Sequence, residues 1–357
     1  MTIDSKSITQ KILLFVLVVT GLYFAKDFLM PLLIGGLLAT LFLPVCKWIE
    51  KKKLSKGLAV FLCLILLLLI ITGFISIFSW KISEVITDID LVKQKIFEAG
   101  DYVQENILNR MGITIEDQIV LLKKEQQSLA NIIVLIIGSL AYLVTNFVLT
   151  LVYFLLLLYY RTHIKNFILQ LANPSHQNEI EKVIYSSSHI AQQYLVGLSK
   201  MIMCLWVMYG IGFSLLGVKN AIFFAILCGV LEIVPFIGNI TGTTLTVLVS
   251  ALHGASFPLL GGIVLVYGTI QFIQGFFLEP IIVGPQVRIN SLFTIIALVL
   301  GELLWGIPGV ILAIPITAIL KIICDHIEPL KPYGFLIGDT EKSRISLITT
   351  IKNYLKK

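Results

Sequence analysis

The sequence predicts an all-α integral membrane protein: a multispan helical bundle with re-entrant hairpins arranged as an inverted repeat. Three observations support this prediction of the fold. The chain of 357 residues is 57% hydrophobic and only 13% charged, with a mean hydropathy of +0.94, whereas a soluble domain of this size needs more polar surface. Two long runs carry no charge. Between Lys219 and Lys321, 101 residues carry only four charges, those of Glu232, Glu279, Arg288 and Glu302.

The first half of the chain contains two membrane spans that length alone predicts. Residues 57–80 and 131–160 hold no charged residue over 24 and 30 positions, more than the roughly 20 residues that cross a bilayer. Ahead of them, residues 12–25 and 28–45 are separated by Lys26-Asp27. The first of these is short, so we expect the pair to form a tight helical hairpin. No small-residue cleavage site follows it, so we expect it to be retained.

The placement of lysine and arginine predicts the orientation in the membrane. Residues 47–56 contain five lysines and one acid, which is typical of a cytoplasmic loop. The N-terminus is then also cytoplasmic, and residues 81–127, with nine acids and six bases, lie outside. The tail from Lys321 carries seven bases and four acids, so we expect it in the cytoplasm.

These features divide the chain into six segments. Residues 161–200 show apolar positions at helical spacing after Pro174-Ser175, which predicts an amphipathic cytoplasmic helix. The predicted organisation is a transmembrane hairpin plus a third span (1–80), an extracytoplasmic helical segment (81–130), a span (131–160), the cytoplasmic amphipathic segment (161–200), a transport core (201–323) and a cytoplasmic tail (324–357).

The region 201–323 is predicted to fall into two similar halves. Helix 201–217 precedes hairpin 221–252, and helix 257–277 precedes hairpin 291–323; the two hairpins would enter the bilayer from opposite sides. Each hairpin is interrupted by Gly and Pro residues, at 235–239 and at 306–309. Irregular backbone at that depth is tolerated only inside protein or beside water, and inverted repeats often place a transport site near the midplane. Six full spans are the alternative, and charge parity does not exclude them.

Acids inside such a region are candidate functional groups because burying a carboxylate in lipid is costly, by roughly 2–3 kcal/mol. Glu232 precedes Pro235 and Gly238, and Glu302 precedes Gly306 and Pro308 at similar spacing. A broken helix exposes backbone groups that bind a polar solute or an ion. The alternative is that both acids mark helix ends at the interface. The candidate substrate- or ion-binding residues are Glu232, Pro235, Gly238, Asn239, Gln271, Gln274, Glu279, Arg288, Glu302 and Pro308.

The roles of these candidates differ. Gln271 and Gln274 lie three residues apart on an apolar helix, where amides bind a hydroxylated solute or bridge helices. Asn239, with three threonines after it, adds a polar lining next to the first break. Glu279 and Arg288 are close enough in sequence to form an ion pair across a short loop, which would be a structural latch.

Several function classes find no support in the sequence. There is no Ser/His/Asp set, no HExxH motif, no P-loop and no dinucleotide fingerprint, so we expect neither an enzyme nor an ATP-driven pump. The five cysteines lack metal-ligand spacing and are interpreted as small apolar side chains in packed helices. We expect no cofactor, no metal centre and no nucleic-acid partner.

The motifs around these residues resemble those of the autoinducer-2 exporter family of bacterial permeases. The run from Leu231 to Gly238 (LEIVPFIG) resembles its E-x-[IV]-P-[YF]-[IF]-G signature, and Leu278-Glu279-Pro280 resembles its next motif. The run from Gly306 to Pro315 resembles its closing G-x-x-G-x-x-[LI]-[AS]-x-P motif. The resemblance covers nearly the whole chain. It implies an oligomeric multi-pass permease of the bacterial cytoplasmic membrane, with the transport core in the C-terminal half.

Three functions follow as hypotheses. The first, implied by the resemblance, is export of a small polar solute such as the signalling molecule autoinducer-2. The second is sodium or lithium exchange against protons, with Glu232 or Glu279 binding each in turn. The third is a membrane scaffold without substrate, in which residues 81–127 bind a partner. The expected partners are a small polar solute or a monovalent cation and proton, membrane lipids, and further copies of the chain.

Overall fold

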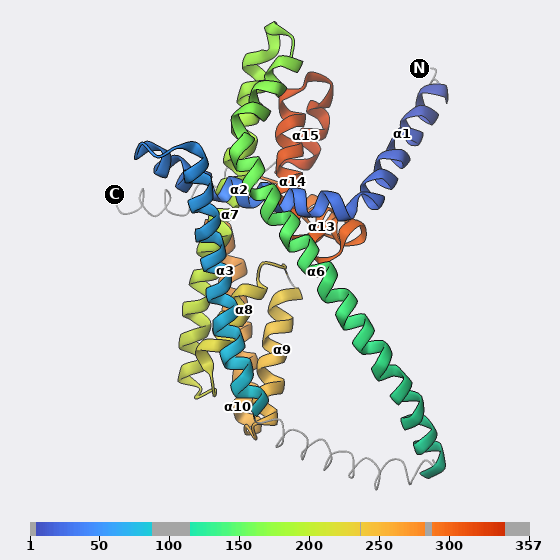
Figure 1. Cartoon of the computed structure of the whole chain (residues 1–357), viewed down its shortest axis with the longest axis vertical. Helices are drawn as coiled ribbons and strands as arrows, with labels where there is room; N and C mark the ends of the chain where they lie inside the picture. Colours follow the sequence, from blue (N-terminus) through green and yellow to red (C-terminus); the bar gives the residue numbers. More distant parts are fainter. Residues whose placement is uncertain (1–4, 88–114, 236, 283–287, 340–357) are drawn as a thin grey trace, which may run out of the picture.

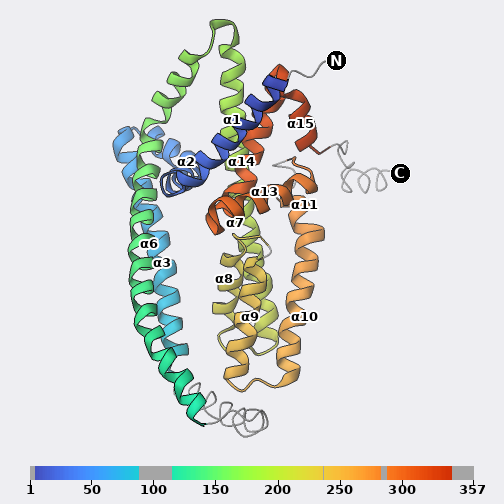
Figure 2. The same ribbon diagram turned by 90° about the vertical axis from the view of Figure 1, so that its right-hand side faces the viewer.

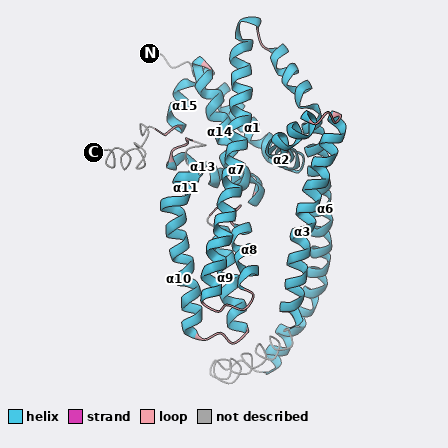
Figure 3. Cartoon of the chain, turned by 90° about the vertical axis from the view of Figure 1, so that its left-hand side faces the viewer, coloured by secondary structure: helices cyan, strands magenta, loops and turns pink. Residues whose placement is uncertain are grey.

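The computed structural model describes residues 5–87, 115–235, 237–282 and 288–339. Every extended regular element within these ranges is a helix, joined by turns and by one isolated β-bridge between Ile289 and Gly338 (Figure 3). The predicted all-α class is therefore confirmed. Residues 88–114, which include most of the predicted extracytoplasmic segment, lie outside the described part of the chain.

The N-terminal region begins with α1 (Ser5–Phe24) and α2 (Lys26–Lys51), separated at Ala25 as the Lys26-Asp27 pair predicted. Their arrangement differs from the expected tight hairpin, because α1 meets α2 at an angle and leads away from it (Figure 1). The indole Nε1 of Trp305 donates a hydrogen bond of 3.0 Å to the carbonyl of Leu22. The end of α1 is therefore held by a residue from the other end of the sequence.

The predicted spans 57–80 and 131–160 lie within α3 (Lys56–Thr87) and α6 (Ile115–Leu171). With α2 they form one bundle, in which α3 and α6 run side by side (Figure 2). Gly35 lets α2 approach α6 closely, since a Cβ there would lie 2.9 Å from the carbonyl oxygen of Thr150. At one end of the bundle Arg161 forms a half-buried ion pair with Glu50.

The short 3₁₀ turn η2 (Pro174–His176) starts α7 (Gln177–Leu215), as Pro174-Ser175 predicted. Helix α7 continues without a break through residue 200, where the amphipathic segment and the transport core were expected to divide. Neither Gly nor Pro interrupts the helix at residue 200, so the backbone continues unchanged. The sequence only becomes more apolar beyond this position.

Helices α8 (Ala221–Leu231) and α10 (Phe257–Ile273) pack against the second half of α7, and α9 (Ile237–Leu252) packs against α8 and α10 (Figure 2). Their shared core includes Leu205, Tyr209 and Phe213 of α7, Cys228 of α8 and Ile263 of α10, all fully buried. Helix α10 passes into the π-helix η3 (Gln274–Leu278) and then into the short α11 (Glu279–Ile282). The predicted helix–break–helix pattern of residues 221–252 is confirmed.

The second hairpin consists of α13 (Ser291–Trp305) and α14 (Ile307–His326), joined at Gly306, whose φ of +64° suits glycine. The 3₁₀ turn η4 (Glu328–Leu330) and α15 (Lys331–Ile337) follow. Asn290 connects these elements. Its Oδ1 caps α13 by accepting from the backbone N–H of Phe293, and its Nδ2 donates to the carbonyl of Leu336 at 2.8 Å.

Among the described residues, six helical segments are long and apolar enough to cross a membrane: Lys26–Lys51, Lys56–Ser79, Tyr142–Leu171, Gln177–Leu215, Phe257–Ile282 and Ile307–His326. The chain is thus built as a multi-pass membrane protein. Three other apolar helices, α8, α9 and α13, are shorter. Both arms of the first hairpin are short, but the second hairpin pairs a short arm with one that is long enough to span. Re-entry into the bilayer stays a prediction.

A single added methyl group tests the packing of the second hairpin. A Cβ at Gly309 would lie 1.9 Å from the carbonyl oxygen of Gly301, so Gly309→Ala forces α13 and α14 apart. We expect the melting temperature in detergent to fall by about 5 °C or more. The control is Gly261→Ala in α10, where nothing lies within 4 Å of the new Cβ. Equal melting of Gly309→Ala and wild type would contradict this packing.

Candidate functional site

The break between α8 and α9 places a carboxylate inside the protein. Helix α8 ends at Leu231, and Glu232 is the residue that follows it. Pro235 has no N–H to continue a helix, and the chain turns through residues 232–235 before the N–H of Gly238 bonds to the carbonyl of Val234 at 2.9 Å. The Glu232 side chain is only 7% exposed.

Two glycines allow α9 to lie directly against α8. A Cβ at Gly238 would lie 1.7 Å from the carbonyl oxygen of Leu231, and a Cβ at Gly242 would lie 3.0 Å from Cys228 Sγ. No other residue type fits Gly238 without moving the backbone. Because these glycines are one helical turn apart, the whole facing side of α9 comes close to the end of α8.

The side of α9 that faces α8 carries polar residues. Asn239, Thr243 and Thr246 are buried at helical spacing, whereas Thr241 and Thr244 are exposed. The Asn239 side chain reaches the Glu232 carboxylate. The predicted polar lining is therefore present, but only those residues that share the face of Asn239 contribute to it.

The π-helix η3 brings a buried amide to the same carboxylate. Gln274 is 5% exposed, and its Nε2 donates to Glu232 Oε1 at 2.6 Å. Gln271 Nε2 in turn donates to Gln274 Oε1 and to the hydroxyl of Tyr209, both at 3.4 Å. Such π-helical turns are frequent at functional sites. Tyr209, Gln271, Gln274 and Glu232 thus form a chain of hydrogen bonds from α7 to the break.

Three buried oxygen atoms at this site lack a hydrogen-bond donor. They are Glu232 Oε2, Asn239 Oδ1 and Thr243 Oγ1, and the three side chains are 7%, 3% and 6% exposed. Leaving a buried polar atom unsatisfied costs about 1–3 kcal/mol, and an ion is one explanation for such atoms in a native protein. We call Glu232, Asn239, Thr243 and Gln274 the Glu232 cluster.

The charges near the Glu232 cluster are negative or neutral. The carboxylate of Glu279 in α11 interacts electrostatically with that of Glu232. The other titratable groups that interact electrostatically with Glu232 are Cys228, Tyr194, Tyr209 and Tyr267. No lysine, arginine or histidine is among the described groups that act on Glu232. A positive charge that entered the cluster would therefore meet no repulsion from a fixed base.

The remaining predicted site residues lie elsewhere. Glu279 and Arg288 are both exposed, and the described residues include no ion pair between them. Glu302 is exposed near the end of α13, and Pro308 lies in the first turn of α14. The structure brings together Glu232, Gly238, Asn239, Gln271 and Gln274, with Pro235 in the connecting turn.

The two hairpins touch through an apolar contact at the first break. Val234 packs against Leu298 of α13 and against Val310 and Ala313 of α14. The first break thus lies against the second hairpin, but the polar cluster belongs to the first hairpin and the π-helix.

Sequence reasoning missed three residues of this region, Tyr209, Cys228 and Thr246, whereas Thr243 was among the threonines expected to line the break. The threonines had a signal, because Asn239, Thr243 and Thr246 repeat at helical spacing. Thr246 Oγ1 lies 3.9 Å from Cys228 Sγ, which the apolar interpretation of the cysteines did not predict. Tyr209 had no signal, since it lies in an apolar helix 62 residues before Gln271.

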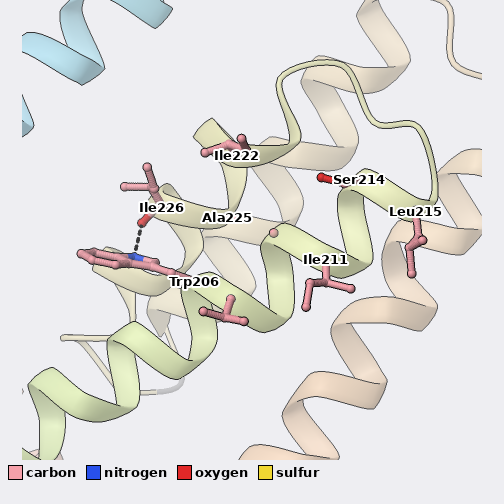
Figure 4. A pocket seen from close by; sticks show the side chains of 9 residues that line it. Trp206, Ile211, Ser214, Leu215, Ile222, Ala225 and Ile226 are labelled. Atoms are coloured by element: carbon pink, nitrogen blue, oxygen red, sulfur yellow. Dashed lines mark hydrogen bonds between the residues drawn. The ribbon is translucent and has the colours of Figure 1, made fainter.

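A groove of about 560 Å³ lies apart from the Glu232 cluster, on the outer side of α7 and α8 (Figure 4). Its lining is apolar except for Ser214 and the indole of Trp206, whose Nε1 donates to the carbonyl of Ile226 at 3.1 Å. This surface suits hydrocarbon rather than a polar solute.

Replacing the buried acid by its amide tests the unsatisfied oxygens. In Glu232→Gln, the acceptor that lacks a donor is replaced by an N–H group, which can point to the orphaned acceptor Asn239 Oδ1. We expect the folded protein to gain about 1 kcal/mol or more, and therefore to melt at a higher temperature in detergent. Glu302→Gln, at an exposed position, should leave the melting temperature unchanged. A lower melting temperature for Glu232→Gln would contradict the absence of a donor at Glu232 Oε2.

Comparison with known proteins agrees with this architecture. The model of the AI-2E family transporters matches residues 12–328. The candidate transport protein YueF of Bacillus subtilis is 24% identical over 319 residues, 84% of each chain, and YhhT of Escherichia coli K12 is 21% identical over 345 residues, 95% of this chain and 96% of its own. YrrI of Bacillus subtilis is 30% identical over 133 residues, 37% of either chain. Since the family model covers most of the sequence, this chain belongs to the AI-2E family of transporters.

Proposed function

We propose that this chain is a secondary transporter whose turnover depends on a proton or a monovalent cation that enters and leaves the Glu232 cluster. The observation that carries the proposal is the set of three buried acceptor oxygens without donors, on Glu232, Asn239 and Thr243. Buried acids in membrane proteins are characteristic of ion and proton pathways. Buried acceptors without donors are costly, so binding of a proton or a cation at these oxygens is favoured.

The chemistry of the cluster fits a hard cation or a proton. Carboxylate, amide carbonyl and hydroxyl oxygens suit hard cations, whereas soft metals prefer sulfur. A single carboxylate supplies one negative charge, which matches one proton or one sodium or lithium ion. Because both would occupy the same carboxylate, uptake of one excludes the other, and this competition is the basis of exchange.

A small polar solute is the second candidate, and the hydrogen-bond chain favours it. Gln271, Gln274 and Tyr209 present amide and hydroxyl groups on one side of Glu232. Such groups bind a hydroxylated molecule of the autoinducer-2 kind, the solute that the motif resemblance implies. In this version the cation or proton drives export, whereas in simple exchange it is itself the cargo.

The arrangement of the cores supports a motion that would expose the cluster. The bundle of α2, α3 and α6 has its own core, and α7, α8 and α10 form another. We propose that the hairpins shift against the first bundle during turnover, as in other transporters with repeats. The lysine-rich turn after α2 would face the cytoplasm, together with both termini.

Flux in sealed proteoliposomes tests the proposed function. Vesicles that contain a pH-sensitive dye are challenged with sodium, then lithium, then autoinducer-2. We expect a cation-driven proton signal in wild type and its loss, by roughly tenfold or more, in Glu232→Gln. An amide neither takes up the proton nor neutralises the cation. Glu302→Gln is the matched control, since it removes an exposed acid next to the second break.

The outcomes separate the candidates. Autoinducer-2 movement that requires Glu232 together with a proton or cation gradient supports coupled export. Cation–proton exchange without solute supports the antiporter. Folded protein that moves neither cations, protons nor autoinducer-2 would contradict the proposed coupling and favour the scaffold hypothesis.

The hydroxyl of Thr243 gives a second test. Thr243→Val keeps the shape of the side chain but removes one of the three unpartnered oxygens. We expect the sodium concentration for half-maximal flux to rise by roughly threefold to tenfold. Thr244→Val, one residue along on the exposed side of α9, should behave as wild type. Equal effects of the two variants would place the ion elsewhere.

A further inference from the structure

We infer that the turn between α2 and α3, together with the adjoining part of α6, binds the headgroup of an anionic phospholipid. The turn and its flanks carry five lysines: Lys47, Lys51, Lys52, Lys53 and Lys56. Three exposed aromatic side chains lie at the same corner of the molecule, Trp48 of α2 and Tyr159 and Tyr160 of α6. This site faces the membrane rather than the transported solute, so it is independent of the proposed function.

The positive charge of the turn is not neutralised within the described part of the protein. The one acid of this segment, Glu50, is already paired, because Arg161 of α6 holds its carboxylate in a half-buried ion pair. Among the described residues, none of the five lysines forms a salt bridge. Like charges this close together repel one another, and an anion from outside the chain relieves that repulsion.

Aromatic rings hold two of the ammonium groups at defined positions. Lys52 Nζ lies 3.7 Å from the centroid of the Trp48 ring, and Lys56 Nζ lies 5.4 Å from the centroid of the Tyr159 ring. Both distances are typical of cation–π contacts. A lysine ammonium carries three N–H groups, so an ammonium that rests on a ring still presents donors to a phosphate oxygen.

The aromatic side chains place this corner at the depth of the lipid headgroups. Trp48 is 58% exposed, and Tyr159 and Tyr160 are exposed on α6. Exposed Trp and Tyr gather at the membrane–water interface, because their rings are apolar and their N–H or O–H groups are polar. The apolar span in α3 begins at Lys56, so the lysines stand where that span meets water.

Apolar surface continues from the lysines along α3, which favours a lipid over a soluble anion. Leu58 and Phe61, in the first turns of α3, are both exposed. A phospholipid places its phosphate beside the lysines and its acyl chains beside these side chains. A soluble anion would contact only the lysines. The combination of basic and apolar surface is that of an anionic phospholipid site.

Lysines elsewhere in the described part of the chain lack this combination. Three of them are paired with acids, Lys165, Lys321 and Lys331. Lys182 and Lys200 of α7 are exposed and form neither a salt bridge nor a cation–π contact among the described residues. These two lysines therefore provide a matched control for the loss of charge.

The fluorescence of Trp48 reports on the lipid beside it. Full-length protein is reconstituted in phosphatidylcholine vesicles that contain a minor fraction of brominated phosphatidylglycerol or of brominated phosphatidylcholine, since bromine quenches a nearby indole. The same measurement on Trp48→Phe, which keeps the other three tryptophans, is subtracted to leave the Trp48 signal. We expect the association constant at Trp48 to favour phosphatidylglycerol by roughly threefold to tenfold. High salt should reduce this preference.

A double substitution tests the lysines without disturbing the contact of Lys52 with Trp48. In Lys51→Gln combined with Lys53→Gln, we expect the preference for phosphatidylglycerol to fall by roughly threefold. Lys182→Gln combined with Lys200→Gln removes the same charge from α7 and should keep the wild-type preference. Melting temperatures recorded in parallel verify that both double variants are folded.

Three results would overturn the lipid site. The first is equal association of the two lipids with Trp48 in wild type, a comparison that needs no lysine variant. The second is an equal loss of preference in both double variants, which would trace the preference to net charge. The third is loss of the preference on addition of inorganic phosphate at constant ionic strength, which would identify a soluble anion as the occupant.

Discussion

The close approach of α9 to α8 is the constraint on which the rest of the site depends. Gly238 lies so near the carbonyl of Leu231 that a Cβ would overlap it, and Gly242 repeats the approach one turn later. This contact brings Asn239 of α9 to Glu232 and Thr243 of α9 to Cys228, one turn earlier on α8. With any larger residue at Gly238 the arms would separate, and Asn239 would move away from Glu232.

In both hairpins, glycines let the two arms pack closely, but the contact has a different consequence in each. Gly301 and Gly309 bring α13 and α14 together as closely as Gly238 brings α9 to α8. Yet Glu302 is exposed, whereas Glu232 is buried. The second hairpin therefore supplies apolar packing, through Leu298, Val310 and Ala313 around Val234. The polar chemistry belongs to the first hairpin, where buried acceptors without donors carry a free-energy cost. Under the proposed function, an incoming cation or proton would relieve that cost.

Helix α7 joins the parts that would have to move together. Its second half carries Tyr209 in the core with α8 and α10, and its first half packs Tyr194 near Ala318 and Ile314 of α14. One continuous helix is thus linked to the Glu232 cluster by hydrogen bonds through Gln271, and it contacts the second hairpin through apolar side chains. A change at the cluster that reoriented the amides of Gln271 and Gln274 would therefore also alter the hydrogen bond between Gln271 and Tyr209 of α7.

The sequence by itself determined the membrane class and the helices, because long apolar runs need lipid. It also located the two breaks, because Gly and Pro residues cluster there, although single prolines such as Pro31 and Pro315 lie inside continuous helices. It also singled out Glu232, Asn239, Gln271 and Gln274 as polar residues in an apolar region. Only the tertiary structure decided which of them meet. Glu232 and Glu302 have similar spacing to their breaks, but burial depends on what packs over a side chain, and the partner of Glu232 lies 42 residues away on a π-helix. No local periodicity in the sequence predicts such a contact. Which of the two acids is buried at the site is therefore decided by the tertiary fold.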